Sequence, residues 1–122
     1  MQYKLTNKEL EIMRVLWTSK KELSITDFIK INSSLNTSTV QASLRSLLKK
    51  SYVRVAGIEQ HNKVLARTYL PVLAEADYLM DQIEKSSLHT NEFFAAFIEK
   101  ESLESLNELE QLIEEQKKKL QK

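Results

Sequence analysis

The spacing of apolar side chains along the first part of the chain predicts three helices. Thr6, followed three residues later by Glu9, has the spacing of a capping box, and a broad apolar face follows it. Ser24 or Thr26 can cap a second, shorter helix, and Thr37 begins a third after a short polar connection. Two short helices and a longer one, with a tight turn before the third, form the helix-turn-helix pattern.

The third predicted helix has one apolar face and one polar face that lacks acidic residues. The apolar face consists of Val40, Leu44, Leu47 and Leu48. The polar face carries short polar groups toward its start and cations toward its end, namely Ser38, Thr39, Gln41, Ala42, Arg45, Ser46 and Lys49. A solvated face usually mixes both signs of charge, whereas a face without carboxylates suits a polyanion and is typical of a recognition helix in a major groove. The alternative is an amphipathic helix whose polar face merely lacks acids.

After this helix the apolar spacing changes to strict alternation, which indicates a β-hairpin. The predicted strands span residues 52–56 and 64–70, and the loop between them contains Gly57 and the polar segment 58–63. The hairpin carries an excess of cations, namely Arg54, Lys63 and Arg67. A wing that lies along a DNA backbone needs such cations to neutralise phosphates. The pattern therefore predicts a winged helix-turn-helix.

The rest of the chain is predicted to be helical. Pro71 is placed in the first turn of a long helix that ends near Lys85, because proline lacks the N–H that would need a partner there. A polar break at residues 86–91 precedes a short apolar segment, and a last helix is capped near Ser102. The apolar residues of this half that we expect at a dimer interface are Leu79, Phe93, Phe94, Phe97, Ile98, Leu103, Leu106, Leu109 and Ile113.

These apolar stripes have little of their own chain to pack against, and on a monomer they would leave an exposed patch. Pairing with the same surface of a second copy buries such a patch under two-fold symmetry. The alternative is a closed helical bundle within one chain. The predicted fold is mainly α, with a winged helix-turn-helix DNA-binding domain (three helices and a two-stranded wing) over residues 1–71 and a helical dimerisation domain over residues 72–122.

Composition restricts the classes of function. One Gly and one Pro fit a mostly helical chain, and the absence of Cys excludes disulfides and thiolate metal sites, so we expect no metal and no cofactor. The histidines, His61 and His89, are expected to be exposed. Nothing resembles a catalytic nucleophile–base pair or a phosphate loop, so an enzyme is not expected. No apolar run approaches the roughly 18–20 residues of a membrane span, and no signal-peptide core is present, so we expect a cytoplasmic protein without membrane insertion.

Charge is distributed unevenly along the chain. Residues 1–70 hold 12 Lys and Arg against 5 Asp and Glu, a net +7, whereas residues 71–122 hold 6 against 12, a net −6. The asymmetry points to a basic half that binds double-stranded DNA and an acidic half with another role. The alternative is an acidic tail that folds back on the basic half.

The order and spacing of several short motifs resemble the penicillinase-repressor family of the BlaI, MecI and CopY repressors. The matching segments are residues 5–6, 9, 12–17, 38–40, 44, 47, 50, 52–53 and 66–69, followed by the Phe-rich segment and the final Leu-spaced helix. The resemblance implies a homodimeric transcriptional repressor on a pseudo-palindromic operator. The residues expected to contact bases are Ser38, Thr39, Gln41, Ala42 and Arg45. The residues expected to contact phosphates are Thr37, Ser46, Lys49, Arg54, Lys63 and Arg67.

The chain also departs from the family pattern. Gln41 and Ala42 stand where the family commonly has a basic residue and then Thr, and Ser46 stands where a later Arg falls. Glutamine pairs with adenine where Arg favours guanine, which points to an operator other than the TACA/TGTA type. The β-lactam branch is released by a membrane sensor protease that cuts an Asn-Phe bond, and the corresponding bond here is Ala96–Phe97. The paired Cys-x-Cys motifs of copper-responsive members are missing, which rules out copper sensing by that route.

Two functions from different classes follow. The first is a sequence-specific DNA-binding repressor. The second is a winged-helix adaptor that binds a protein partner through its acidic helices, and the net +7 of the first half disfavours it.

Overall fold

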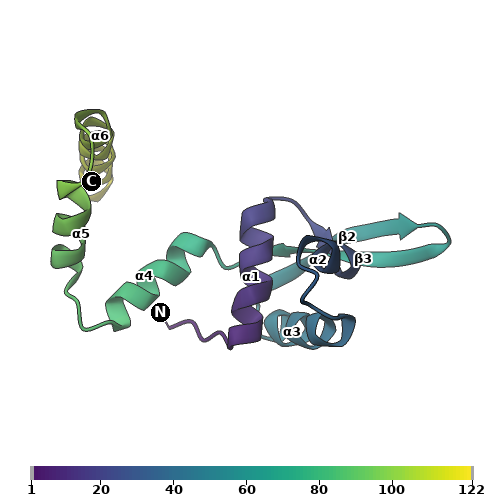
Figure 1. Ribbon diagram of the computed structural model, residues 1–122. Helices are drawn as coiled ribbons and strands as arrows, with labels where there is room; N and C mark the ends of the chain where they lie inside the picture. Colours follow the sequence, from purple (N-terminus) through teal and green to yellow (C-terminus); the bar gives the residue numbers. More distant parts are fainter. Residues whose placement is uncertain (1, 122) are drawn as a thin grey trace. The chain divides into compact units, whose positions relative to one another are not determined.

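The computed structural model describes residues 2–121, which form six helices and three strands (Figure 1). In chain order these are α1 (Asn7–Ser19), β1 (Leu23–Ser24), α2 (Ile25–Ile31), α3 (Thr37–Lys49), β2 (Val53–His61), β3 (Val64–Pro71), α4 (Glu75–Lys85), α5 (Thr90–Glu99) and α6 (Leu103–Leu120). The chain divides into two compact units, which we call the head (residues 1–81) and the tail (residues 82–122). The predicted class, a winged helix-turn-helix followed by further helices, is confirmed.

Side-chain caps explain where the helices of the head begin. Thr6 and Glu9 form the predicted capping box at the start of α1. Ser24, rather than Thr26, caps α2, and it does so reciprocally with Asp27. The side chain of Asn36 accepts a hydrogen bond from the backbone N–H of Thr39 at 2.8 Å, so α3 begins at Thr37 as expected. Each cap satisfies backbone donors that the first turn of a helix leaves free.

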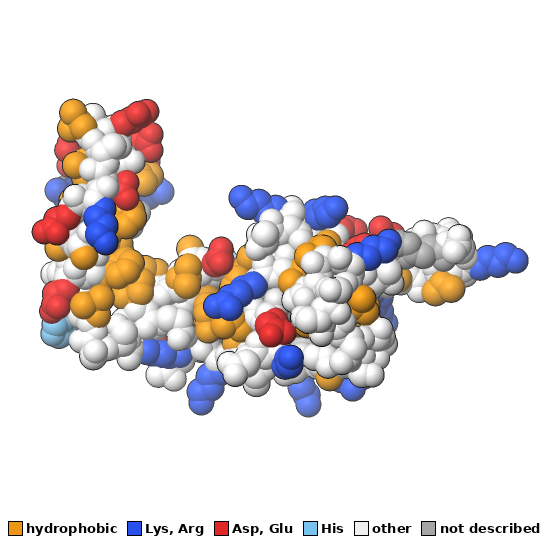
Figure 2. Space-filling view, in the orientation of Figure 1, with side chains coloured by type: hydrophobic (Ala, Val, Ile, Leu, Met, Phe, Trp, Pro, Cys, Tyr) orange, Lys and Arg blue, Asp and Glu red, His pale blue; other side chains and the backbone are white. Residues whose placement is uncertain are grey.

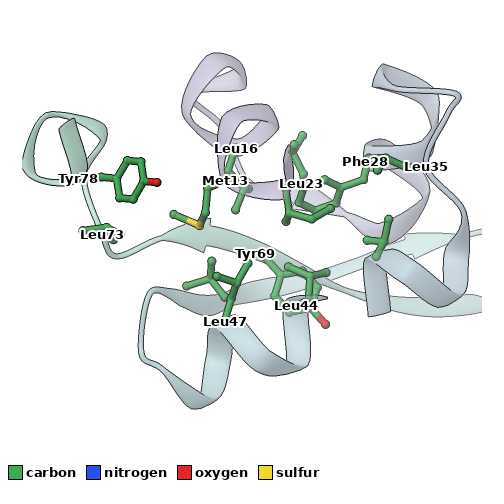
Figure 3. Close-up of a cluster of buried hydrophobic side chains, with 13 residues drawn as sticks. Met13, Leu16, Leu23, Phe28, Leu35, Leu44, Leu47, Tyr69, Leu73 and Tyr78 are labelled. Carbon is green, nitrogen blue, oxygen red and sulfur yellow. The ribbon is translucent and has the colours of Figure 1, made fainter. Parts of the chain in front are cut away.

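The apolar face of α3 lies at the centre of the head. Val40, Leu44 and Leu47 are fully or almost fully buried, and Leu48 is half-buried. Figure 3 shows Leu44 and Leu47 pointing from α3 toward the strand that carries Tyr69. Burial of each such aliphatic side chain contributes about 1.5–3 kcal/mol. The predicted periodicity of α3 is therefore confirmed by its packing.

The sheet has one strand more than the predicted hairpin. Its order is β1-β3-β2, and both pairings are antiparallel. The extra strand, β1, pairs Leu23 with Tyr69 and Ser24 with Thr68. A strand of two residues is too short to show an alternating pattern, so periodicity could not have found it.

The hairpin is longer than predicted, and the expected loop at residues 57–63 is wrong. Strands β2 and β3 stay paired from Val53–Pro71 out to His61–Val64, so most of the polar segment is strand. Gly57 is not a turn residue, because it lies within β2 beside a bulge that shifts the register between Val55 and Gly57. The turn instead uses Asn62, whose φ of 56° is left-handed, a conformation that Asn tolerates better than most residues.

The prediction that Pro71 starts a helix is also wrong. Pro71 is the last residue of β3, where it pairs with Val53, and α4 starts only at Glu75. Proline is tolerated at the end of a strand because a missing N–H there breaks little of the ladder. The local sequence could not distinguish the end of a strand from the first turn of a helix.

The start of α4 packs onto the rest of the head through Tyr78 and Asp81. Tyr78 is 9% exposed and its ring lies 5.9 Å from that of Trp17, whose Nε1 donates a 2.9 Å hydrogen bond to the carbonyl oxygen of Leu73. The carboxylate of Asp81, 4% exposed, accepts a 3.0 Å hydrogen bond from the backbone N–H of Tyr3. These contacts extend the head to Asp81, ten residues beyond the expected boundary at 71.

The hairpin geometry makes opposite predictions for Gly57 and Asn62. In Gly57→Ala the new Cβ would lie 3.5 Å from Glu22 Oε1 and Thr68 Oγ1, an ordinary contact. Because glycine in a strand interior is entropically unfavourable, we expect this variant to be neutral or more stable by up to about 1 kcal/mol. Asn62→Ala should cost about 1 kcal/mol, since alanine tolerates a left-handed φ less well. Urea unfolding measures both, and a marked loss of stability in Gly57→Ala would show that the site does not accommodate a Cβ.

Candidate nucleic-acid interface

Helix α3 presents its polar face to solvent, because its opposite face is held in the core. The exposed side chains of this face are Thr37, Ser38, Gln41, Ala42, Arg45 and Lys49. Thr39 is half-buried. All five residues expected to contact bases thus come from one short helix, and no carboxylate lies among them. The sequence prediction of one continuous, acid-free face agrees with this arrangement.

The wing contributes a cation to the same surface. Gln41 and Arg45 from α3 and Arg67 from β3 line one shallow hollow. The other residues that line it are Ile25, Leu44, Leu48 and Tyr69. Arg67 and Tyr69 are alternate residues of one strand, so they lie on the same face of the sheet, the face that packs against α3. The structure therefore brings together two arginines and a glutamine from segments more than 20 residues apart in sequence.

The other two wing cations lie elsewhere. Lys63 is exposed at the hairpin turn, next to Asn62. Arg54 pairs with Leu70, whereas Arg67 pairs with Ile58. Because side chains alternate along β3, Leu70 and Arg54 lie on the opposite face of the sheet from Arg67. The structure thus does not place Arg54 beside Arg67 and α3. The side chain of His61, also in the hairpin, lies outside the described part of the chain.

Ser46, expected to contact a phosphate, uses its hydroxyl within the head. Its Oγ donates a 2.6 Å hydrogen bond to Oε2 of Glu9. Lys50 Nζ donates to Oε1 of Glu9 at 2.7 Å and to the carbonyl oxygen of Lys4 at 2.9 Å. The single hydroxyl hydrogen of Ser46 is therefore not available to a phosphate, and Ser46 instead helps to hold α3 against α1.

Glu9 is the centre of this network, and sequence reasoning saw only its capping role. Its side chain is 3% exposed, and its carboxylate accepts hydrogen bonds from the backbone N–H of Thr6, from Ser46 and from Lys50. Burial acts to raise the pKa of the carboxyl, but the hydrogen bonds from Lys50, Ser46 and Thr6 and the charge of Lys50 outweigh it, so the pKa lies below its ordinary value. The partners Ser46 and Lys50 lie 37 and 41 residues away, which is why no local pattern revealed them.

The described residues form neither a metal-binding cluster nor a membrane-spanning helix. Among residues 2–121, no three His, Asp or Glu side chains gather in a way that could hold a metal ion. None of the described helices is both long and apolar enough to cross a membrane.

The head has the fold of a winged helix-turn-helix domain. A family profile described as "Penicillinase repressor" matches residues 5–115. The chain therefore belongs to the penicillinase repressor family, and the predicted resemblance is confirmed. As a regulator of this family it is not an enzyme.

Comparison with solved structures gave similar folds at low identity. The adhesin competence repressor AdcR from Streptococcus pyogenes is 19% identical, with 98% of this chain and 82% of that chain covered and a TM-score of 0.45. A mutant of MepR from a multidrug-resistant S. aureus clinical isolate is 17% identical, with 97% and 80% covered and a TM-score of 0.48. A search of curated proteins gave no match.

The Glu9 network predicts a pH-dependent stability. Glu9→Gln should lower the free energy of unfolding at neutral pH by about 1–3 kcal/mol, because Lys50 loses its buried charged partner. The folded-state pKa of Glu9 lies below its ordinary value of 4.5, so its contribution is complete above that pH and is lost as the pH falls through the lower folded-state value. The difference between wild type and variant should therefore shrink in acid.

Chemical unfolding across a pH series measures this difference. Glu108→Gln, at an exposed position of α6, is the matched control and should track the wild type. If the difference in the free energy of unfolding between wild type and Glu9→Gln stayed constant from neutral pH to about pH 3, the charge of Glu9 would not be what stabilises the contact between α1 and α3.

Proposed function

We propose that this chain is a DNA-binding transcriptional repressor that acts as a homodimer on a pseudo-palindromic operator. The observation that carries the proposal is the exposed, acid-free face of α3, which continues across one hollow to Arg67 of the wing. A helix of this kind fits the major groove of B-DNA, and its first turns reach the base edges. Family membership over residues 5–115 supports the same class of function.

We assign base contacts by the chemistry of each exposed side chain on α3. Gln41 can bind the N6 and N7 atoms of adenine, and Arg45 can bind O6 and N7 of guanine. The methyl group of Ala42 suits the methyl of thymine, and the hydroxyls of Ser38 and Thr39 can donate to or accept from either kind of edge. The base sequence of the proposed operator therefore differs from that of an operator whose repressor has a basic residue at the position of Gln41.

Phosphate contacts are assigned to the groups around this face. Lys49 lies at the end of α3, Thr37 at its start, Arg67 across the hollow and Lys63 at the wing turn. Each cation that neutralises a phosphate releases a counterion and makes binding depend on salt. We exclude Ser46, because its hydroxyl donates to Glu9, and Arg54, because it lies on the other face of the sheet.

The homodimer is supported by the lack of a core in the tail. Helices α5 and α6 contain no buried residue among those described. Phe94, Phe97 and Ile98 are 40–45% exposed. Leu103, Leu112 and Ile113 are 53–75% exposed, and Figure 2 shows hydrophobic side chains in orange over both helices. An apolar surface of this extent marks a site that a partner buries. A second copy of the tail presents the same apolar surface, so two copies would bury each other under two-fold symmetry.

Within this proposal, each expected interface residue keeps some exposure in the single chain. Leu79 of α4 is 51% exposed. Phe93, Leu106 and Leu109 are half-buried. Two heads fixed by such an interface would bind half-sites about one helical turn, or a multiple of it, apart.

Release by a membrane sensor protease is inferred from family kinship alone. Ala96 and Phe97 are both exposed, but their bond lies inside α5. A helical bond must open locally before a protease can cut it. Cleavage at this position would therefore depend on how easily α5 unfolds.

The assignment of bases and phosphates predicts two different losses of DNA affinity. On a duplex enriched from random DNA by the full chain, Gln41→Ala should lose about 1–3 kcal/mol and bind unrelated duplexes almost unchanged. Lys49→Ala should weaken all duplexes alike and reduce the slope of log K against log salt by about 1. Fluorescence anisotropy over a salt series measures both. A change of sequence preference in Lys49→Ala would show that the two roles are assigned to the wrong residues.

The dimer makes a separate prediction. Phe97→Glu should convert a two-chain species into single chains and weaken operator binding by about 100-fold or more, because the second head no longer binds as part of the same molecule. Phe97 lies in the tail and is 42% exposed, so the head should remain folded in this variant. Lys100→Glu, at an exposed neighbouring position, is the control and should remain paired. Sedimentation equilibrium distinguishes the two states, and a wild type that sediments as one chain at micromolar concentration would refute the dimer.

A further inference from the structure

The residues that precede α1 are held in place, although they form neither helix nor strand. Chain ends are poorly ordered unless specific contacts tie them down. Residues 2–6, which we call the N-terminal strap, have such contacts. The backbone N–H of Tyr3 donates to a carboxylate oxygen of Asp81 at 3.0 Å, and Figure 1 shows the strap running from α1 toward α4. The backbone N–H of Lys4 donates to the hydroxyl oxygen of Tyr52 at 3.3 Å.

Tyr52 connects this strap to the end of α3. Its backbone N–H donates to the carbonyl oxygen of Leu47 at 2.9 Å. Its own carbonyl oxygen accepts from the backbone N–H groups of Val72 at 2.7 Å and Leu73 at 3.0 Å, just before α4. Its ring packs edge to face against that of Tyr3, with 5.8 Å between the centroids. A single residue thus contacts the end of α3, the strap and the segment that leads into α4.

Helix α4 is attached to the rest of the head at two points. Tyr78 and Asp81 are three residues apart, so they lie on the same face of the helix, and both are buried. Tyr78 packs against Trp17 at the end of α1, whereas Asp81 holds the strap. A helix attached at one point can pivot about it, but attachment to two different segments fixes its direction. Asp81 is the last residue of the head, so α4 enters the tail directly after this contact.

A simpler role for the strap would be to cover the core. Tyr3 and Leu5 do pack against the core as partly buried residues. The contact with Asp81 is of another kind, because a carboxylate that is 4% exposed is unfavourable unless hydrogen bonds replace the water it loses. An apolar residue would cover the core without that cost. A directional hydrogen bond at this position therefore favours a role in geometry.

We propose that Asp81 is a positioning residue: by holding the strap it fixes the direction of α4, and so the spacing of half-sites that the dimer accepts. The inference rests on the proposed function, in which α4 connects each head to the paired tails. Each base pair added between two half-sites moves them apart by about 3.4 Å and rotates them by about 34–36°. Heads on a rigid connection fit few spacings, whereas heads on a loose connection fit many.

The test compares wild type and Asp81→Ala on a duplex enriched by the full chain and on derivatives with altered spacing. With two base pairs inserted between the half-sites, the wild type should lose about 10-fold or more in affinity, and Asp81→Ala less than about 3-fold. At the original spacing the variant should bind about 10-fold more weakly, because a loosely held second head has a lower effective concentration. Fluorescence anisotropy measures these affinities. The same dependence on spacing in both proteins would overturn the proposal.

Two further variants separate the contact from a change of charge. Asp77→Ala removes a carboxylate at an exposed position of the same helix, so it alters the net charge equally and should keep the wild-type dependence on spacing. Asp81→Asn keeps an oxygen that can accept from Tyr3, so it should lie closer to wild type than Asp81→Ala does. If Asp77→Ala tolerated the insertion as well as Asp81→Ala, charge would be the cause and the proposal would be overturned.

A duplex with a single half-site shows whether Asp81 only stabilises the head. One head binds there without its partner, so the direction of α4 has no influence on the affinity. Asp81→Ala should therefore bind this duplex within about two-fold of the wild type. If its affinity for the single half-site fell as far as its affinity for the whole operator, the role would be structural and the positioning role would be wrong.

Failure of this inference can be told apart from failure of the proposed function. If the wild type enriches no duplex and binds none at low salt, the repressor assignment fails and the role of Asp81 fails with it. If the wild type binds an enriched duplex as a dimer, but Asp81→Ala shows the same dependence on spacing, only the positioning role is wrong.

Discussion

The buried carboxylate of Glu9 is the interaction on which the arrangement of the head depends. It accepts hydrogen bonds from the start of α1 and from Ser46 and Lys50 at the end of α3. A charged group 3% exposed is tolerated only because these donors replace the water it loses. The contact fixes the orientation of α3 on α1, and hence the direction in which the polar face of α3 points.

Helix α3 has to meet two demands at once. Val40, Leu44 and Leu47 fill the space between the other helices and the sheet, while Gln41, Ala42 and Arg45 between them stay exposed. Close packing of one face leaves no freedom to rotate the helix, so the exposed set follows directly from the buried set. The rigid sheet then adds Arg67 from a distant part of the chain.

The tail follows a different rule. Its helices have clear apolar stripes, yet α5 and α6 contain no buried residue among those described. Helices of this length gain most of their stability from packing rather than from propensity. The stability of the tail and the proposed pairing of two chains would therefore be one property, and a change that weakens one would weaken the other.

Local signals in the sequence were sufficient to predict α1, α2 and α3. The capping box at Thr6 and the spacing of apolar residues on α3 act within one or two turns, so they can be read directly along the chain. The acid-free face of α3 was predictable for the same reason. The family resemblance was also visible from the order of short motifs.

Contacts between distant residues decided the rest. Strand β1 exists because Leu23 and Ser24 meet β3, and Pro71 ends a strand because it meets Val53. The role of Ser46 changed because Glu9, 37 residues away, takes its hydroxyl hydrogen. Alternation along β3 separates Arg54 from Arg67, although both were predicted to bind phosphates. None of these partners is near in sequence, and only the folded chain brings them together.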